Sequence, residues 1–236
     1  MVREAIAALD DPPLRPVFVG GSGFLPVEAA RSLPEGVRPV YVDISSFQVK
    51  FFRRFLKALV DSDTPEQLRN WFSRDVYPVL KEHYRKYRGR FYSRNQVFTA
   101  LEKLFRIDFF FQAEALQEAR RIAGSMVDVQ QDIRTYLSES GRCHDFICLS
   151  NVLDYLPREE LVPMFGACRA SGASVYALMT EACRHPRDVT EAWERAGYSL
   201  HPLADELTVR NRGLGSWTLG RSWNRSGNIR LLVPGA

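Results

Sequence analysis

The feature that most constrains this chain is a glycine-rich turn between a predicted strand and a predicted helix. A strand is expected over residues 15–20, where branched and aromatic side chains cluster in the segment RPVFVG. A helix is expected from about Pro26, and a second strand ends on Asp43. Strand, turn, helix and strand in this order are typical of a βαβ unit. The turn itself consists of Gly20, Gly21, Ser22 and Gly23.

Two features of this unit indicate a ligand that contains a nucleoside. Glycine has no Cβ atom, so the backbone of the turn can approach a bound molecule closely. Asp43 follows the second strand, where an acidic side chain can accept hydrogen bonds from both hydroxyls of a ribose. An ordinary tight turn would also explain the glycines. The prediction therefore depends on the glycine turn and the acidic strand end occurring together.

Composition excludes several classes of protein. The chain has 236 residues, of which 45% are hydrophobic and 25% charged, which is typical of globular proteins. We expect a cytoplasmic location. A net charge of +4 is too small to indicate nucleic acid by itself. No apolar run approaches the roughly 18 residues that a membrane span needs, and the first residues do not resemble a secretion signal. The 4 cysteines and 4 histidines lack ligand spacing, so no metal site is expected.

Strands that alternate with helices predict an α/β fold, a doubly wound sheet formed by one domain over residues 1–236. A long helical stretch separates the second strand from the third, although a simple crossover unit needs only about 30 residues. We therefore expect a helical insertion or cap at about 45–124, with one of its helices interrupted at Pro78. Later strands are expected at 125–129, 145–150, 173–182, 198–203, 207–210 and 228–233.

Two further groups of candidate ligand contacts follow later strands, because ligands of such sheets bind at the carboxyl ends of the strands. After the third strand, Asp132 can accept a hydrogen bond from an adenine amino group while Ile133 packs on the ring. A helix N-cap is an equally good interpretation of Asp132. The fourth strand, in DFICLSNVLDYLP, is followed by four polar side chains, for which capping and core packing are the alternatives. They are Ser150, Asn151, Asp154 and Tyr155.

These segments, taken in order, resemble a known family. VFVGGSG, YVDIS, the pair Asp132 and Ile133, and DFICLSNVLDYLP are similar to the motifs of the class I S-adenosylmethionine-dependent transferases. The similarity covers about residues 15–60 and 125–183. It implies a Rossmann-like sheet of the class I methyltransferase type that binds S-adenosylmethionine. The contacts that it implies are the glycine turn, Asp43, Ile44, Asp132, Ile133 and Ser150.

Two details resemble enzymes that attack the aminocarboxypropyl arm of this cofactor rather than its methyl group. GSGFLP is similar to the nicotianamine synthases, and the insertion that begins DISSFQVKFFRRFLKAL resembles the betaine-lipid-type 3-amino-3-carboxypropyl transferases. The azetidine-2-carboxylate synthases are similar in size and layout. The resemblance implies either cyclisation of the arm, with release of methylthioadenosine, or its transfer to a small acceptor. A conventional small-molecule methyltransferase is the alternative, favoured by LSNVLDYLP.

Cyclisation requires the cofactor's own amine to be deprotonated and held in line behind the carbon that it attacks, in a dry pocket. The candidates for orienting that amine or accepting its proton are Asn151, Asp154, Tyr155 and Tyr176. Aromatic side chains that could close the pocket are Phe91, Tyr92, Trp217 and Trp223.

A third hypothesis is nucleic-acid binding. The segment 85–94, RKYRGRFYSR, interleaves basic and aromatic residues that could contact phosphates and bases. Runs this short are more often solvated helix ends, so we expect a small-molecule substrate and no nucleic acid.

Overall fold

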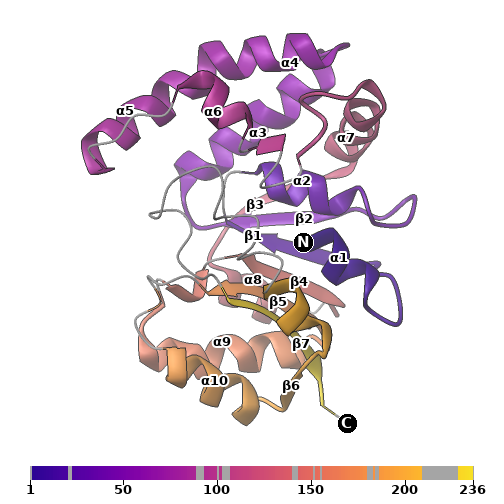
Figure 1. The fold of residues 1–236 in the computed structure, drawn as a ribbon. Helices are drawn as coiled ribbons and strands as arrows, with labels where there is room; N and C mark the ends of the chain where they lie inside the picture. Colours follow the sequence, from indigo (N-terminus) through magenta and orange to yellow (C-terminus); the bar gives the residue numbers. More distant parts are fainter. Residues whose placement is uncertain are drawn as a thin grey trace.

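The structure is a computed structural model that describes residues 2–20, 23–88, 93–99, 101–102, 107–139, 143–150, 152–154, 156–179, 183, 186–208 and 228–235. These residues form an α/β fold around a seven-stranded, mostly parallel sheet with the strand order β3-β2-β1-β4-β5-β7-β6 (Figure 1). The strands are β1 (Pro16–Val19), β2 (Val40–Asp43), β3 (Val127–Gln130), β4 (Phe146–Ser150), β5 (Ser174–Met179), β6 (Tyr198–Leu200) and β7 (Asn228–Pro234).

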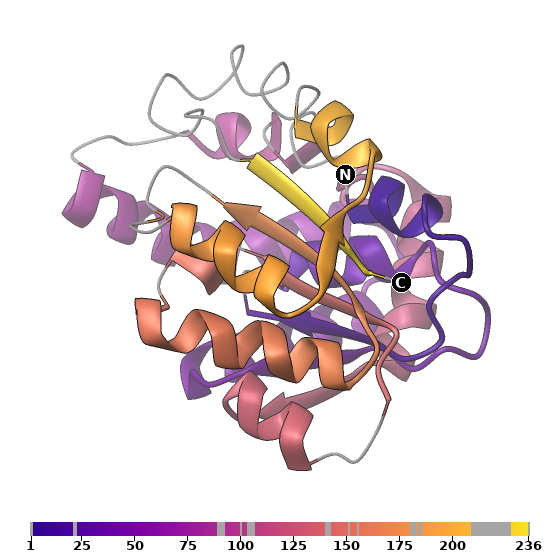
Figure 2. The same cartoon turned by 90° about the horizontal axis from the view of Figure 1, so that it is seen from below.

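The order of the strands places β1 at a reversal of the chain. β1 pairs in parallel with β2 on one side and with β4 on the other, so the chain builds outward to β3 and then returns across β1. β5 continues the parallel sheet, whereas β7 runs antiparallel between β5 and β6 (Figure 2). The carboxyl ends of β1 to β5 therefore lie along one edge of the sheet, which we call the carboxyl edge.

Alternating side chains of the strands build a separate core on each face of the sheet. Phe18 and Tyr41 pack into a first core under α1 (Val2–Ala7), α2 (Phe24–Ala30) and later helices. Val17 and Val42 face a second core under α8 (Ile133–Glu139), α9 (Arg158–Ala170) and α10 (Pro186–Arg195). The helices α8, α9 and α10 lie side by side in Figure 2. Helices on both faces agree with the predicted doubly wound arrangement.

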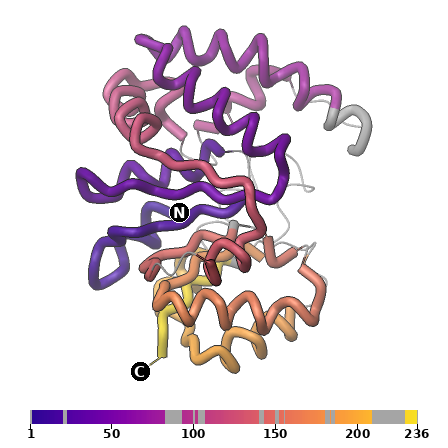
Figure 3. The backbone as a smooth tube through the Cα atoms, turned by 180° about the vertical axis from the view of Figure 1, so that it is seen from behind, coloured from indigo at the N-terminus to yellow at the C-terminus, as the bar shows by residue number. Residues whose placement is uncertain are grey.

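The predicted helical block between β2 and β3 is present in the structure. It comprises α3 (Ser46–Asp61), α4 (Pro65–Trp71), the π-helical turn η1 (Phe72–Val76), α5 (Tyr77–Arg88), α6 (Arg94–Thr99) and α7 (Ala113–Ser125). Figure 3 shows these helices gathered beside β2 and β3, at the opposite end of the molecule from α9 and α10. Their buried aromatic side chains pack on one another and on α2, as expected for a core. They include Phe55, Phe72, Phe109 and Phe110, all in contact with Phe24 or with each other.

Hydroxyl side chains cap the first turns of two of these helices. Ser45 Oγ accepts a hydrogen bond from the backbone of Gln48 at the start of α3, and Thr64 forms a capping box with Gln67 at the start of α4. The expected interruption near Pro78 is also present. It is the π-helical turn η1, and Pro78 is the second residue of α5. A wider turn there accommodates a residue that has no backbone N–H to donate.

One predicted strand is wrong. A strand was expected over 207–210, but residues 203–208 form a helix, and residues 209–210 lie outside the described residues. Ala204 and Leu207 are buried in the first core, three positions apart, which is a helical spacing rather than the alternation of a strand. The expected strand over 198–203 is correspondingly shorter, since β6 ends at Leu200.

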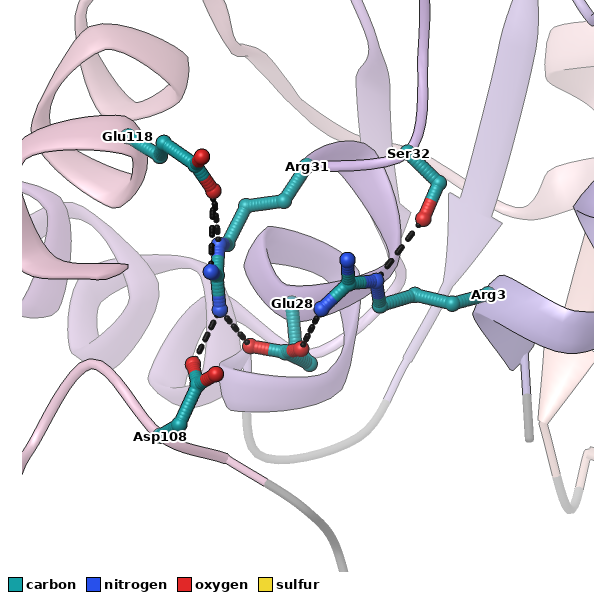
Figure 4. Close-up of polar contacts among 6 residues, drawn as sticks. All are labelled: Arg3, Glu28, Arg31, Ser32, Asp108 and Glu118. Atoms are coloured by element: carbon teal, nitrogen blue, oxygen red, sulfur yellow. Dashed lines mark hydrogen bonds and ion pairs between the residues drawn. The ribbon is translucent and has the colours of Figure 1, made fainter. Parts of the chain in front are cut away.

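A buried ionic cluster joins the sheet layer to the insertion (Figure 4). Arg31, which directly follows α2, pairs with Glu28 at 2.8 Å, with Glu118 of α7 at 2.8 Å, and with Asp108. On its other side, Glu28 accepts a hydrogen bond of 2.9 Å from Arg3 of α1. Burial of Glu28 raises the pKa of its carboxyl group, against the opposing effect of the two arginines. Because α2 runs back from the carboxyl edge, this cluster at its C-terminal end lies away from the glycine turn.

Candidate functional site

The reversal of the chain at β1 is a topological switch point, where open α/β sheets bind ligands outside the carboxyl ends of their strands. Three segments meet there. A Cβ atom built on Gly20 would lie 3.6 Å from Oδ2 of Asp43 and 3.9 Å from Cγ2 of Val152. Gly20 directly follows β1, Asp43 ends β2, and Val152 follows β4. The structure therefore brings the start of the glycine turn close to the acidic strand end, and the segment after β4 joins them.

The glycine turn needs glycine at the positions that the structure describes. Gly20 has a φ of +65° and Gly23 a φ of +77°, in the left-handed region that residues with a Cβ atom rarely adopt. The N–H of Gly20 donates to the carbonyl of Val42 over 3.0 Å, which holds the start of the turn against the end of β2. Gly21 and Ser22, also predicted to contact the cofactor, lie outside the described residues.

Asp43 is held in place by two hydrogen bonds from its own neighbourhood. Its Oδ1 atom accepts from the backbone N–H of Ser45 at 2.7 Å, and its Oδ2 atom accepts from the hydroxyl of Tyr41 at 3.2 Å. The side chain of Tyr41 is fully buried, and its ring stacks on Phe52 of α3 with centroids 4.0 Å apart. Burial and the adjacent carboxylate raise the pKa of the Tyr41 phenol, so it remains a donor.

Ile44 presents an apolar surface beside this carboxylate. It directly follows β2 and is 70% exposed, which is unusual for an isoleucine, and Phe47 in the first turn of α3 is 64% exposed. An exposed apolar side chain next to an acidic strand end suits a flat ring, because covering it removes apolar area from water. The position of Ile44 is therefore compatible with its predicted contact to the cofactor.

The structure gives Asp132 the capping role that the sequence left as an alternative. Oδ1 of Asp132 accepts from the backbone N–H of Arg134 at 2.9 Å, and the carbonyl of Asp132 accepts from Tyr136, so Asp132 caps α8. The guanidinium of Arg134 also donates to both carboxylate oxygens, at 3.0 and 3.1 Å, and lowers the pKa of Asp132. Ile133 is buried in the second core and packs on protein there.

The segment after β4 approaches the crevice through an irregularity in the sheet. The pairing of β4 with β5 shifts by one residue between Cys148 and Ser150, as in a β-bulge, a feature common next to active sites. The 3₁₀ turn η3 (Val152–Asp154) follows, and Asp154 is buried within it. Of the candidate catalytic residues in this segment, Asn151 and Tyr155 lie outside the described residues.

Tyr176 is a candidate residue buried within the sheet. It lies within β5, opposite Cys148 of β4 and Leu231 of β7, and its side chain is buried in the first core. Burial raises the pKa of its phenol, so the group stays protonated at neutral pH. Tyr176 is thus enclosed by the core rather than exposed at the carboxyl edge.

Sequence reasoning did not identify Tyr41 as part of the site. The signal was present in the spacing, because Tyr41 and Asp43 are two residues apart on one strand and such residues face the same side. The four aromatic residues proposed to close the pocket, Phe91, Tyr92, Trp217 and Trp223, lie outside the described residues.

In the described part of the chain, no three histidine, cysteine or acidic side chains are grouped so as to hold a metal ion. None of the described helices combines the length and the apolar character needed to cross a membrane. The sequence matches no protein-family model, and a search of the curated proteins finds no similar one.

Proposed function

We propose that this protein binds S-adenosylmethionine at the switch point and catalyses a reaction of its aminocarboxypropyl arm. The observation that carries the proposal is the convergence of Gly20 and Asp43 at the carboxyl ends of β1 and β2. The strand order, with β7 reversed between β5 and β6, also supports it. A mostly parallel sheet of this kind is compatible with the Rossmann-like fold that the resemblance implies.

The residues at the crevice suit the parts of this molecule. The carboxylate of Asp43 would accept hydrogen bonds from the two ribose hydroxyls, and Ile44 would cover one face of the adenine. The glycine turn allows the rest of the molecule to lie close to the backbone, where a Cβ atom on Gly20 would reach toward Asp43. The segment after β4, which includes Val152 and Asp154, would then border the sulfonium and its arm.

The choice of the arm depends on the resemblance of the glycine turn and the helical insertion to arm-transferring enzymes. In cyclisation, the α-amine of the substrate forms a new C–N bond at the γ-carbon. The C–S bond breaks with its electron pair left on sulfur, and methylthioadenosine leaves. The amine must first lose a proton, for which Asp154 is the described candidate acceptor, and Asn151 and Tyr155 remain predicted partners. Transfer to a small acceptor would follow the same displacement with an external nucleophile.

Methyl transfer is the second candidate function, because LSNVLDYLP after the fourth strand is typical of small-molecule methyltransferases. The products separate the two. The purified protein is incubated with S-adenosylmethionine alone, and the products are identified by mass spectrometry against an incubation without protein. Enzyme-dependent methylthioadenosine with azetidine-2-carboxylate supports cyclisation, and methylthioadenosine formed only with an acceptor supports arm transfer. Adenosylhomocysteine formed only with an acceptor supports methyl transfer.

A matched pair of variants ties the reaction to the crevice. Asp43→Asn removes the carboxylate at the carboxyl end of β2. Asp145→Asn removes a carboxylate that accepts from the backbone of Leu14 and Arg15, beside the amino ends of β1 and β4. We expect the first to weaken methylthioadenosine binding at least tenfold, and the second to leave it unchanged. If calorimetry detects no binding of S-adenosylmethionine or methylthioadenosine to the unaltered protein, the proposal is rejected.

A further inference from the structure

We propose that Tyr41 is a positioning residue that orients the carboxylate of Asp43 to recognise two adjacent hydroxyls on a ligand. The inference rests on the proposed function in its choice of ligand, a ribonucleoside. It goes beyond that function by assigning selectivity for the diol to a side chain that a ligand at the crevice would not touch. Tyr41 is fully buried and reaches the site through one hydrogen bond, from its hydroxyl to Oδ2 of Asp43 at 3.2 Å.

The contacts around Tyr41 form a closed chain that begins and ends in the glycine turn. A Cβ atom on Gly23 would lie 2.5 Å from Cδ2 of Phe52, so the ring of Phe52 is packed directly against the turn. Phe52 stacks on Tyr41 with an angle of 27° between their rings. Tyr41 donates to Asp43, and Asp43 Oδ2 lies 3.6 Å from the Cβ position of Gly20. The Gly23 end of the turn is thus linked to the carboxylate through two buried rings, and the Gly20 end lies directly beside the carboxylate.

This arrangement fixes the plane of the carboxylate. The N–H of Ser45 holds Oδ1 at 2.7 Å and the hydroxyl of Tyr41 holds Oδ2, so each oxygen already accepts one hydrogen bond. A carboxylate oxygen accepts about two hydrogen bonds, so each keeps capacity for one more. Two oxygens held in this way can each accept from one of two adjacent hydroxyls, and a carboxylate that rotates freely would lose more entropy on binding them.

The stack on Phe52 explains how the helical insertion takes part. Phe52 belongs to α3, the first helix after β2, and is fully buried. Its ring prevents Tyr41 from tilting away from the strand, since protein interiors are close-packed and a buried ring has no space to move into. The insertion therefore supports the ribose-binding carboxylate, whatever else its helices contribute.

The test compares two tyrosine variants that each remove one buried hydroxyl. Tyr41→Phe removes the donor to Asp43. Tyr198→Phe is the matched control, because the hydroxyl of Tyr198 is also buried and donates over 2.8 Å to the carbonyl of Ala173, outside the crevice. Calorimetry measures the dissociation constants of adenosine and 2′,3′-dideoxyadenosine, which differ only in the two ribose hydroxyls.

We expect the unaltered protein to bind adenosine more tightly than the dideoxy compound. Tyr41→Phe should reduce that preference about five- to tenfold, the net effect of one typical hydrogen bond, and Tyr198→Phe should preserve it. Equal weakening of both ligands by Tyr41→Phe would overturn the inference, because it would indicate a structural role alone.

A second measurement needs no ligand and so separates failure of this inference from failure of the proposed function. The backbone amide of Ser45 donates to Asp43, and its proton resonance can be followed by NMR in the free protein. If Tyr41 orients Asp43, Tyr41→Phe shifts this resonance and Tyr198→Phe does not. An unchanged Ser45 resonance in Tyr41→Phe overturns the inference even if nucleosides bind. If the unaltered protein binds no nucleoside but Tyr41→Phe still shifts the Ser45 resonance, only the proposed function is rejected.

Discussion

Arg31, the residue that follows α2, forms an ion pair with Glu28 of that helix, and the two side chains are only 5% and 6% exposed. Burial removes both charges from water, and the pair is tolerated because Arg3, Asp108 and Glu118 supply further partners. The partners come from α1, from α7 and from the residues before α7. The pair therefore links the insertion to the layer of helices over the sheet.

Replacement of Arg31 should destabilise the protein strongly. Arg31→Met leaves Glu28 buried with Arg3 as its remaining cation, and breaking a buried pair in this way costs about 3–5 kcal/mol. Arg53→Met is the control, because Arg53 pairs with Asp128 at 2.6 Å but is 60% exposed, where water screens the interaction. Urea unfolding measures the free energy of unfolding of both variants. A loss for Arg31→Met no larger than that for Arg53→Met would contradict the prediction.

Replacement of Gly23 should also be costly, for two separable reasons. Gly23→Ala adds a Cβ atom both at a φ of +77° and 2.5 Å from the buried ring of Phe52, and we expect a loss of about 2–4 kcal/mol. Gly36→Ala tests the backbone effect alone, since Gly36 has a φ of +84° and no atom within 4 Å of its Cβ position. That variant should lose about 1 kcal/mol. Equal losses by urea unfolding would show that Phe52 moves aside easily.

The pair formed by Asp132 and Arg134 should make stability depend on acid pH. The hydrogen bonds from Arg134 lower the pKa of Asp132 below its ordinary value of 3.8 in the folded protein. Its contribution is therefore complete above that value and is lost as the pH falls through the lower, folded pKa. The difference in unfolding free energy between the unaltered protein and Asp132→Asn should be constant near neutral pH and shrink below about pH 4. Arg134→Gln should weaken this dependence, because only the backbone hydrogen bonds to Asp132 then remain. If the difference in unfolding free energy stays constant down to the lowest pH at which the protein folds, the role given to the pair of Asp132 and Arg134 is refuted.

Ile44 should matter for binding and little for folding. Because it is 70% exposed, Ile44→Ser should leave the unfolding midpoint in urea nearly unchanged. If adenine covers this side chain, the substitution should weaken methylthioadenosine binding about tenfold. Leu14→Ser is the control, because Leu14 is 60% exposed but lies before β1, away from the carboxyl edge. Unchanged affinity for Ile44→Ser in calorimetry would show that the base lies elsewhere.

Much of the fold could be predicted because its signals are local. The glycine turn, the strand that ends on Asp43 and the capping hydroxyls of Ser45 and Thr64 each depend on residues within a few positions of one another. The strand expected over 207–210 failed for the same reason, since a short apolar segment does not distinguish a strand from a helix until its packing is known.

The parts that could not be predicted depend on contacts between distant residues. Arg31 meets Asp108 and Glu118, which lie 77 and 87 positions later, and no local pattern indicates such partners. The stacking of Phe52 on Tyr41 is decided by how α3 packs on β2. Asp132 was open between a ligand contact and a helix cap until the position of Arg134 was known.

The place of β7 in the sheet has a consequence for synthesis on the ribosome. β7 (Asn228–Pro234) is inserted between β5 and β6, although both of these strands are made before it. A nascent polypeptide that has not yet reached residue 228 carries Ser174–Met179 with one unpaired side and Tyr198–Leu200 without a pairing partner in the described sheet. Until translation passes that point, these exposed edges are open to chaperones and to neighbouring nascent chains.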